Sequence, residues 1–427
     1  MADKLYPYEY TYAEKKAIAL IEEGAFNKDC EYEMPVFSLE DQIRYAQSWD
    51  RWNPLFNDID YARSAGYKSI PAIPGFVEPI VRIMPPKEFG TPIALNYAFP
   101  GDGYDHEVHY YRPIYANEHL HVRITTNNVV DITPPQGEKF RALIIENHIK
   151  VLDEKEDTVA TAILRWPEFF SPQSIEKNNN HPHASFRYEH SPHCYSADDW
   201  NLIKDIWTHE RIRGAETLYY EDVIVGESIP WTTEGPITAM DMIRLHGHFV
   251  VGAEPIREFL LSNEEDFLVY DEASGVYYYQ NYSHFVPHFG RRPQFFNTTG
   301  RNLFVRAVTN WCGDSGFVSK LAWRLINSLP PERQANRFPA EFHRPSYLLS
   351  VPYLKNENRY MNQHGLVMDC VISKGYIAKK YVESGKGYVD LVCWGEDLDN
   401  NIIAEGLVTV ALPLKTALAK GVYNEKK

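Results

Sequence analysis

The sequence lacks the cysteine pattern of a disulfide-stabilised protein. Its five cysteines, at positions 30, 194, 312, 370 and 393, are scattered along the chain without paired spacing. Disulfides persist mainly in oxidising compartments, where small secreted domains depend on them. We therefore expect a reduced, cytoplasmic protein.

Positive charge and long apolar runs are also scarce. The chain has 43 Lys and Arg against 58 Asp and Glu, a net charge of −15, so nucleic acid and anionic membranes would repel it. No apolar run approaches the length that spans a bilayer, and the first residues do not resemble a signal peptide. We expect a soluble protein with neither partner, although a few local arginines are enough to hold a small anionic ligand.

Several catalytic and metal signatures are missing as well. The sequence contains no glycine-rich phosphate loop and no serine-nucleophile elbow, which excludes kinases and serine hydrolases. Histidines and a cysteine gather between residues 181 and 194, but without the ligand spacing of a structural zinc site. No metal is expected there.

Apolar and aromatic residues are plentiful. Apolar residues make up 44% of the 427 positions, enough for the cores of roughly two to three domains. The aromatic fraction is 14%, with 29 tyrosines, which indicates large apolar pockets or interfaces.

Hydrophobic periodicity predicts the same order of helices and strands twice. Helices are expected over residues 12–25, 38–52, 73–84, 198–213, 237–249 and 298–311. Ser38 and Asp41 have the spacing of a capping box at the start of the second helix. Strands are expected over residues 106–114, 119–132, 140–153, 158–169, 365–372, 387–397 and 400–414.

This order favours a tandem repeat. The Arg-Pro pairs at residues 112–113 and 344–345 follow Asn53 and Asn281, respectively, at nearly the same distance. We predict an N-terminal domain over 1–170, a linker and helix over 171–214, and a C-terminal domain over 215–427. Each domain is expected to have an α+β fold, with a helix wrapped by a twisted antiparallel sheet. The two sheets would be joined or packed edge to edge.

A motif near residue 50 carries a family resemblance. The stretch from Ser48 to Phe76 contains an Asn-Pro pair, an acidic helical segment and a Pro-Gly turn. It resembles the hydratase motif of the MaoC-like, (R)-specific enoyl-CoA hydratase family. The matching positions are Asn53, Pro54, Leu55, Asp58, Ala62, Ala65, Gly66 and residues 72–75. The whole chain resembles tandem two-domain acyl dehydratases, whose first half looks like the dehydratase domain of fatty acid synthase.

The resemblance implies a fold and an activity. It implies a double hotdog, with two long helices each wrapped by an antiparallel sheet. It also implies reversible addition of water at the 2,3 double bond of an acyl-CoA thioester, without a metal or redox cofactor. A homodimer is expected. The acyl group and the direction of the reaction are left open, although the aromatic content hints at a bulky acyl group.

Both copies of the motif depart from the family pattern. In the first, Phe56 replaces the histidine, and Asp50 stands one residue too far from Asn53. In the second, the resemblance places Asn281 and His284 at the asparagine and histidine, but Tyr279 replaces the acid. The resemblance therefore implies Asp50, Asn53, Asn281 and His284 as the catalytic candidates. The segment from Asn310 to Phe317 resembles the NW-x-GD-x-GF segment of the tandem proteins.

Substrate-binding candidates surround these positions. Gly75 and Gly300 let a backbone N–H approach the thioester carbonyl at the start of a long helix. Trp52 and Phe56 can line an acyl tunnel, and Arg291 and Arg292 can bind phosphates of CoA.

Structural roles remain alternatives for the same residues. Asp50 is equally compatible with a surface acid, Asn53 with a turn residue and His284 with a hydrogen-bonded core histidine, with His288 a weaker candidate for its role. The glycines are also compatible with simple helix starts, and the arginine pair with a solvated surface. At the level of function, a non-catalytic acyl-CoA-binding partner and a hotdog thioesterase stay open beside the hydratase.

Overall fold

The computed structural model describes the parts of the chain that form the sheets and the long helix of the second half. These are residues 30–34, 36–76, 105–131, 141–170, 193–236, 268–271, 276–279, 297–325, 370–400 and 402–415. The helices expected over 12–25 and 237–249 lie outside the described residues, as does the part of the 73–84 helix beyond Phe76.

The first half begins with the capped helix that the sequence predicts. Helix α2 (Leu39–Trp49) follows Ser38, whose hydroxyl group accepts a hydrogen bond from the Asp41 backbone N–H at 3.1 Å. The Asp41 carboxylate in turn accepts from the Ser38 N–H at 2.9 Å, which completes the capping box. The helix ends at Trp49 rather than at Trp52, because Asp50 leaves the helical conformation and a turn leads into the 3-10 helix η3 (Pro54–Phe56).

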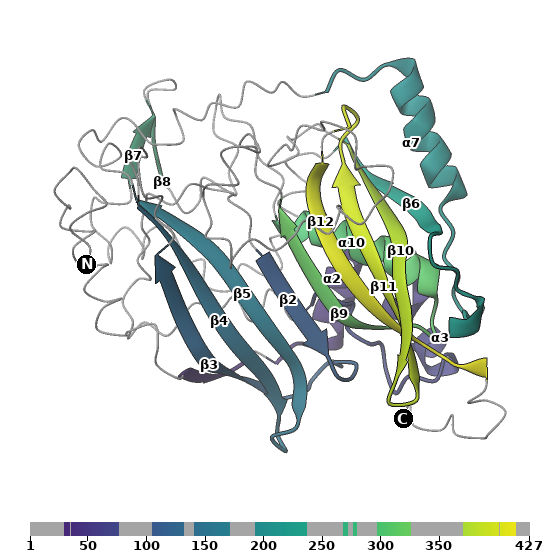
Figure 1. The fold of residues 1–427 in the computed structure, drawn as a ribbon, viewed down its shortest axis with the longest axis horizontal. Helices are drawn as coiled ribbons and strands as arrows, with labels where there is room; N and C mark the ends of the chain where they lie inside the picture. Colours follow the sequence, from purple (N-terminus) through teal and green to yellow (C-terminus); the bar gives the residue numbers. More distant parts are fainter. Residues whose placement is uncertain are drawn as a thin grey trace.

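One antiparallel sheet of ten strands runs through both halves (Figure 1). The first half contributes β1 (Cys30–Glu33), β2 (Asp105–Tyr110), β3 (Leu120–Asp131), β4 (Arg141–Asp153) and β5 (Thr158–Phe170). The second contributes β6 (Ser228–Glu234), β9 (Phe317–Leu325), β10 (Val371–Glu383), β11 (Lys386–Glu396) and β12 (Ile402–Leu412). The spatial order is β1-β3-β4-β5-β2-β9-β12-β11-β10-β6, and β7 (Leu268–Asp271) pairs separately with β8 (Val276–Tyr279).

The two halves meet where β2 pairs with β9. Val108 lies opposite Leu321 and His106 opposite Trp323, and all four side chains are buried. The halves are therefore joined through backbone hydrogen bonds in one sheet, which was one of the two arrangements expected from the sequence.

Helix α10 (Asn297–Cys312) is the long helix predicted over 298–311. It packs against β6, β9, β10, β11 and β12, which curve around it in Figure 1. Phe304 is fully buried on this face, and a Cβ on Gly406 of β12 would lie 3.2 Å from its ring. Glycine at 406 thus allows the helix to approach the sheet closely.

Helix α7 (Ala197–His209) packs against the edge strand β6. A second capping box, between Ser196 and Asp199, starts this helix. It stops four residues earlier than the sequence predicts, because Glu210 is extended. The short helices α3 (Ile59–Ser64) and η5 (Tyr220–Asp222) complete the described helices.

Some strands were not predicted. β1, β6 and β9 have no counterpart in the expectations, and β10 starts at Val371, where the predicted strand over 365–372 nearly ends. Pro230 interrupts the strand pattern of β6, and proline is tolerated there because β6 is the last strand of the sheet.

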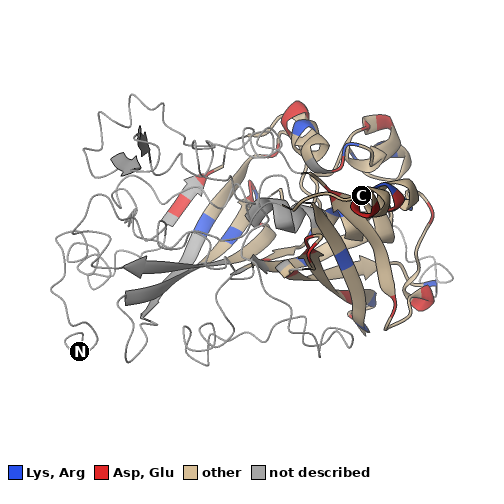
Figure 2. Cartoon of the chain, turned by 90° about the horizontal axis from the view of Figure 1, so that it is seen from above, with Lys and Arg blue, Asp and Glu red and all other residues tan. Residues whose placement is uncertain are grey.

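Residues of both charge signs occur along the described parts of the chain. Figure 2 shows acidic and basic residues interspersed over the described helices, strands and turns. Among the described residues, no helix has both the length and the apolar character needed to cross a membrane.

Candidate active site at the junction of the two halves

The motif around Asp50 folds into a compact local structure. Asp50 is the C-cap of α2, and its backbone N–H donates to the Ala46 carbonyl at 2.7 Å. Asn53 is the N-cap of η3, and its Oδ1 accepts from the Leu55 N–H at 3.1 Å. The Asn57 side chain donates to the carbonyls of Asp50 and Asn53, each at 2.8 Å. These bonds fix the two predicted catalytic residues relative to each other.

Asp50 is a buried carboxyl group. It is 1% exposed, so the surface role that the sequence also allowed is wrong. Burial raises its pKa from 3.8 to about 6, against the opposing effects of the Arg306 charge and of hydrogen bonds from Asn53, while the Glu210 charge raises the pKa further. Among the described residues, none forms a hydrogen bond with Asp50 Oδ2.

Arg306 of α10 supplies the positive charge beside Asp50. Its guanidinium group, 3% exposed, pairs with Glu210 and Glu234. Asn310, one turn further along α10, donates to Glu210 Oε1 at 2.9 Å. The Trp52 ring lies over the arginine, with 5.3 Å from Cζ to the ring centroid.

The cluster around Arg306 contains more carboxyl groups than cations. Asp50, Glu210 and Glu234 surround one arginine, so full ionisation would leave an excess of negative charge in a buried place. A like charge and a low dielectric both favour the protonated form of a carboxyl group. The site can therefore hold and release a proton at Asp50 close to neutral pH.

A small cavity of about 50 Å³ lies beside the motif, between the two halves. This volume is large enough for at least one water molecule or a small group. Its walls include Asn53, Phe56 and Pro74 from the first half and Thr309, Gly313 and Val318 from the second. Because Asn53 also interacts with Asp50, the cavity and the buried carboxyl group share one residue.

The segment that resembles NW-x-GD-x-GF connects the halves. Asp314 follows α10, and its carboxylate accepts a 2.7 Å hydrogen bond from the Tyr61 hydroxyl group. The Tyr67 hydroxyl group donates to the Asp314 carbonyl at 2.9 Å. Gly313 has φ +66°, and a Cβ there would lie 2.7 Å from the Gly214 carbonyl oxygen, so this turn requires glycine.

The substrate-binding candidates of the first half, Trp52, Phe56 and Gly75, differ in exposure and in hydrogen bonding. Phe56 is 3% exposed and forms cavity wall in place of the motif histidine. Trp52 is 64% exposed, with one face over Arg306. The Gly75 N–H donates to the Tyr110 hydroxyl group at 2.8 Å, so a thioester oxygen would have to displace that hydroxyl.

Most catalytic and binding candidates of the second half are not among the residues that the structure describes. Asn281, His284, Arg291 and Arg292 lie outside the described residues. Gly300 lies in the first turn of α10, at the helix start where the sequence predicts it.

Three residues of the buried cluster were not among the sequence candidates. Arg306 lies in the middle of the helix predicted over 298–311. A charged residue among the apolar residues of such a helix indicates a buried partner of opposite charge. The sequence contains no indication that Glu210 and Glu234 have a buried partner. Glu210 directly follows α7 and Glu234 is the last residue of β6, and the residue before each of them in the sequence is polar.

Comparison with known proteins shows the fold. No protein-family model and no curated protein matches the chain. A solved MaoC-like dehydratase superposes with a TM-score of 0.51 at 16% identity, over 90% of this chain and 98% of that one. The chain has the fold of a MaoC-like dehydratase. The α+β hotdog-type fold predicted from the sequence, an antiparallel sheet wrapped around a helix, is confirmed.

Two further solved structures are more distant. A MaoC domain dehydratase from Chloroflexus aurantiacus J-10-fl has a TM-score of 0.47 at 12% identity, over 91% of this chain and 96% of that one. A conserved hypothetical protein from Mycobacterium tuberculosis, described as a double hotdog, has a TM-score of 0.48 at 11% identity, over 90% and 96%.

Proposed function

We propose that this protein is a hydratase/dehydratase that adds or removes water at the 2,3 double bond of an acyl-CoA thioester. One observation carries the proposal: Asp50, in the hydratase-like motif, is buried and has a pKa of about 6. The fold is consistent with this reaction, although a fold by itself does not determine an activity.

Asp50 would serve as a general acid and base. A group whose pKa lies near the working pH is efficient at both tasks, which together contribute about 10²–10⁴-fold to a rate. Hydration requires a proton to be taken from water and one to be delivered to C2. Asn53 would hold the Asp50 carboxyl group, and Arg306 would stabilise its ionised form.

The remaining roles follow the resemblance and stay predictions. His284, near Asn281 in the second copy of the motif, would supply the second proton-transfer group, and Gly300 a backbone donor for the thioester oxygen. Arg291 and Arg292 would bind the CoA phosphates. A bulky acyl group, a dimeric assembly and a cytoplasmic location belong to the same prediction.

Enoyl-CoA turnover tests the proposal. Crotonyl-CoA and a panel of longer or aromatic enoyl-CoA substrates should lose their conjugated absorbance in the presence of the protein. Asp50→Asn should lower kcat by about 10²-fold or more. Asp60→Asn, on the exposed first turn of α3, is the matched control and should retain activity. Unchanged turnover in Asp50→Asn would remove Asp50 from the mechanism, and the same result for His284→Ala would remove His284.

A non-catalytic acyl-CoA-binding protein is the second candidate. The observation in its favour is Phe56, a buried phenyl ring where the motif has its proton-transferring histidine. Saturable binding of acyl-CoA without any turnover would support this candidate. Release of free CoA, detected with a thiol reagent, would instead indicate a thioesterase.

A further inference from the structure

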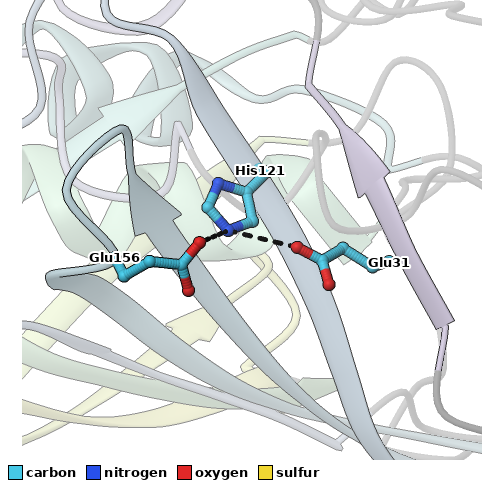
Figure 3. A group of neighbouring side chains, drawn as sticks. All are labelled: Glu31, His121 and Glu156. Carbon is cyan, nitrogen blue, oxygen red and sulfur yellow. Dashed lines mark ion pairs between the residues drawn. The ribbon is translucent and has the colours of Figure 1, made fainter.

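Three potential metal ligands converge at the edge of the sheet, away from the motif. Glu31 lies on β1, His121 on β3 and Glu156 in the turn between β4 and β5 (Figure 3). His121 Nε2 lies 3.3 Å from Glu31 Oε1 and 3.2 Å from Glu156 Oε1. One ligand atom from each of the three side chains lies within 4.8 Å of the others.

The two contacts of His121 are not hydrogen bonds. Nε2 is shielded from solvent, and among the described residues no acceptor meets it with hydrogen-bond geometry. Ligands at the 2.0–2.1 Å distances of zinc are about 3.3–3.4 Å apart in a tetrahedral site, and the two observed separations match that spacing.

Arg123 orients the two carboxylates. It donates to both oxygens of Glu31, at 3.2 and 3.3 Å, and to Glu156 Oε2 at 3.0 Å. These bonds leave Glu156 Oε1 directed at His121, and an oxygen of Glu31 has a second lone pair. Such outer contacts commonly position metal ligands.

We propose that Glu31, His121 and Glu156 bind a divalent transition-metal ion, with Zn²⁺ the best match. An imidazole nitrogen and two carboxylate oxygens suit zinc, whereas Mg²⁺ and Ca²⁺ favour oxygen ligands alone. Both carboxylates are at least half exposed, so an ion can reach them from solvent. Bound there, the ion would fasten the edge strand β1 to β3 and to the β4–β5 turn.

Zinc titration of the metal-free protein, without a polyhistidine tag, tests the site. Isothermal titration calorimetry should detect one equivalent of Zn²⁺ that His121→Ala loses. Glu156→Gln, at an exposed position, should bind that equivalent at least tenfold more weakly. Glu154→Gln, in the same turn but outside the group, is the matched control and should bind like the wild type. Zinc should also raise the melting temperature of the wild type and of this control.

The pH dependence gives a second readout. The ligands must be deprotonated to bind a metal, so the affinity should fall at acid pH and binding should release protons. If the wild type binds no zinc, or if both ligand variants bind it with unchanged stoichiometry and affinity, the cluster is an ion-pair network only and the proposal is overturned. Glu156→Gln keeps the test decisive if His121→Ala fails to fold.

Discussion

The Tyr61 hydroxyl group donates a hydrogen bond of 2.7 Å to the carboxylate of Asp314, across the boundary between the two halves. Tyr61 belongs to α3 in the hydratase-like motif, and Asp314 follows the long helix α10. Asp50 precedes α3 in the same motif, and Arg306 lies on α10. The bond therefore ties together the two segments that build the buried site.

We expect Tyr61→Phe to lower the free energy of unfolding by about 1–3 kcal/mol, because the buried Asp314 carboxylate would lose its charge-assisted hydrogen bond. Urea denaturation at neutral pH measures the change. Tyr111→Phe removes a hydroxyl group from a side chain that is 60% exposed, and should have little effect. Equal stability of the two variants would show that the bond does not hold the halves together.

The stability of the protein should depend on the ionisation of Asp50. Its pKa is about 6 in the folded protein and 3.8 in the unfolded reference, so the native state binds the proton more tightly. The stabilising contribution is present below pH 4 and is lost as the pH rises through 6. A pKa shift of this size changes the free energy of unfolding by about 3 kcal/mol.

Asp50→Asn should therefore be more stable than the wild type at pH 8, by up to about 3 kcal/mol, and the difference should shrink towards pH 4. Unfolding curves across this pH range measure it, with Asp60→Asn as the control. A difference that does not change with pH would contradict the raised pKa of Asp50.

If Asp50 acts as the proposed acid and base, Glu210 should set its acid strength. Its negative charge raises the pKa of Asp50, so Glu210→Gln should lower that pKa. The acidic limb of the kcat/KM profile should then move to lower pH. Glu216→Gln, at a half-exposed position in the segment after α7, is the control. An unmoved limb in Glu210→Gln would separate Glu210 from the titration.

Arg306 should matter for stability through the carboxylates that it pairs. Arg306→Met leaves Glu210 and Glu234 without their buried cation, which should cost about 3–5 kcal/mol. Replacing both glutamates by glutamine in the same chain should recover much of this loss, because no unpaired charge remains. Thermal unfolding of the single and triple variants measures the difference, and equal instability of the two would show that lost packing, not charge, is responsible.

Local signals predicted several elements well. The capping box at Ser38 starts α2, and the alternating runs of the first half become β2, β3, β4 and β5. These succeed because caps and strand periodicity act over a few residues. The strands β6 and β10 were missed or misplaced, because their pairing partners decide them more than their own sequence does.

In the candidate site too, local sequence patterns identified some residues and tertiary packing brought in the others. Asp50 and Asn53 were named as candidates from the sequence, because the motif resemblance depends on residue types and spacings within one short stretch. Arg306 and Glu210 were not, because they reach Asp50 only after α10 and the segment behind α7 pack against the first half.

The sequence alone determined the class of fold, the position of the motif and the loss of its histidine at Phe56. These depend on residue type and on spacing along the chain. Only the tertiary structure decided that Asp50 is buried and that its pKa is raised. Desolvation and the balance of neighbouring charges depend on distances between residues that lie more than 150 positions apart.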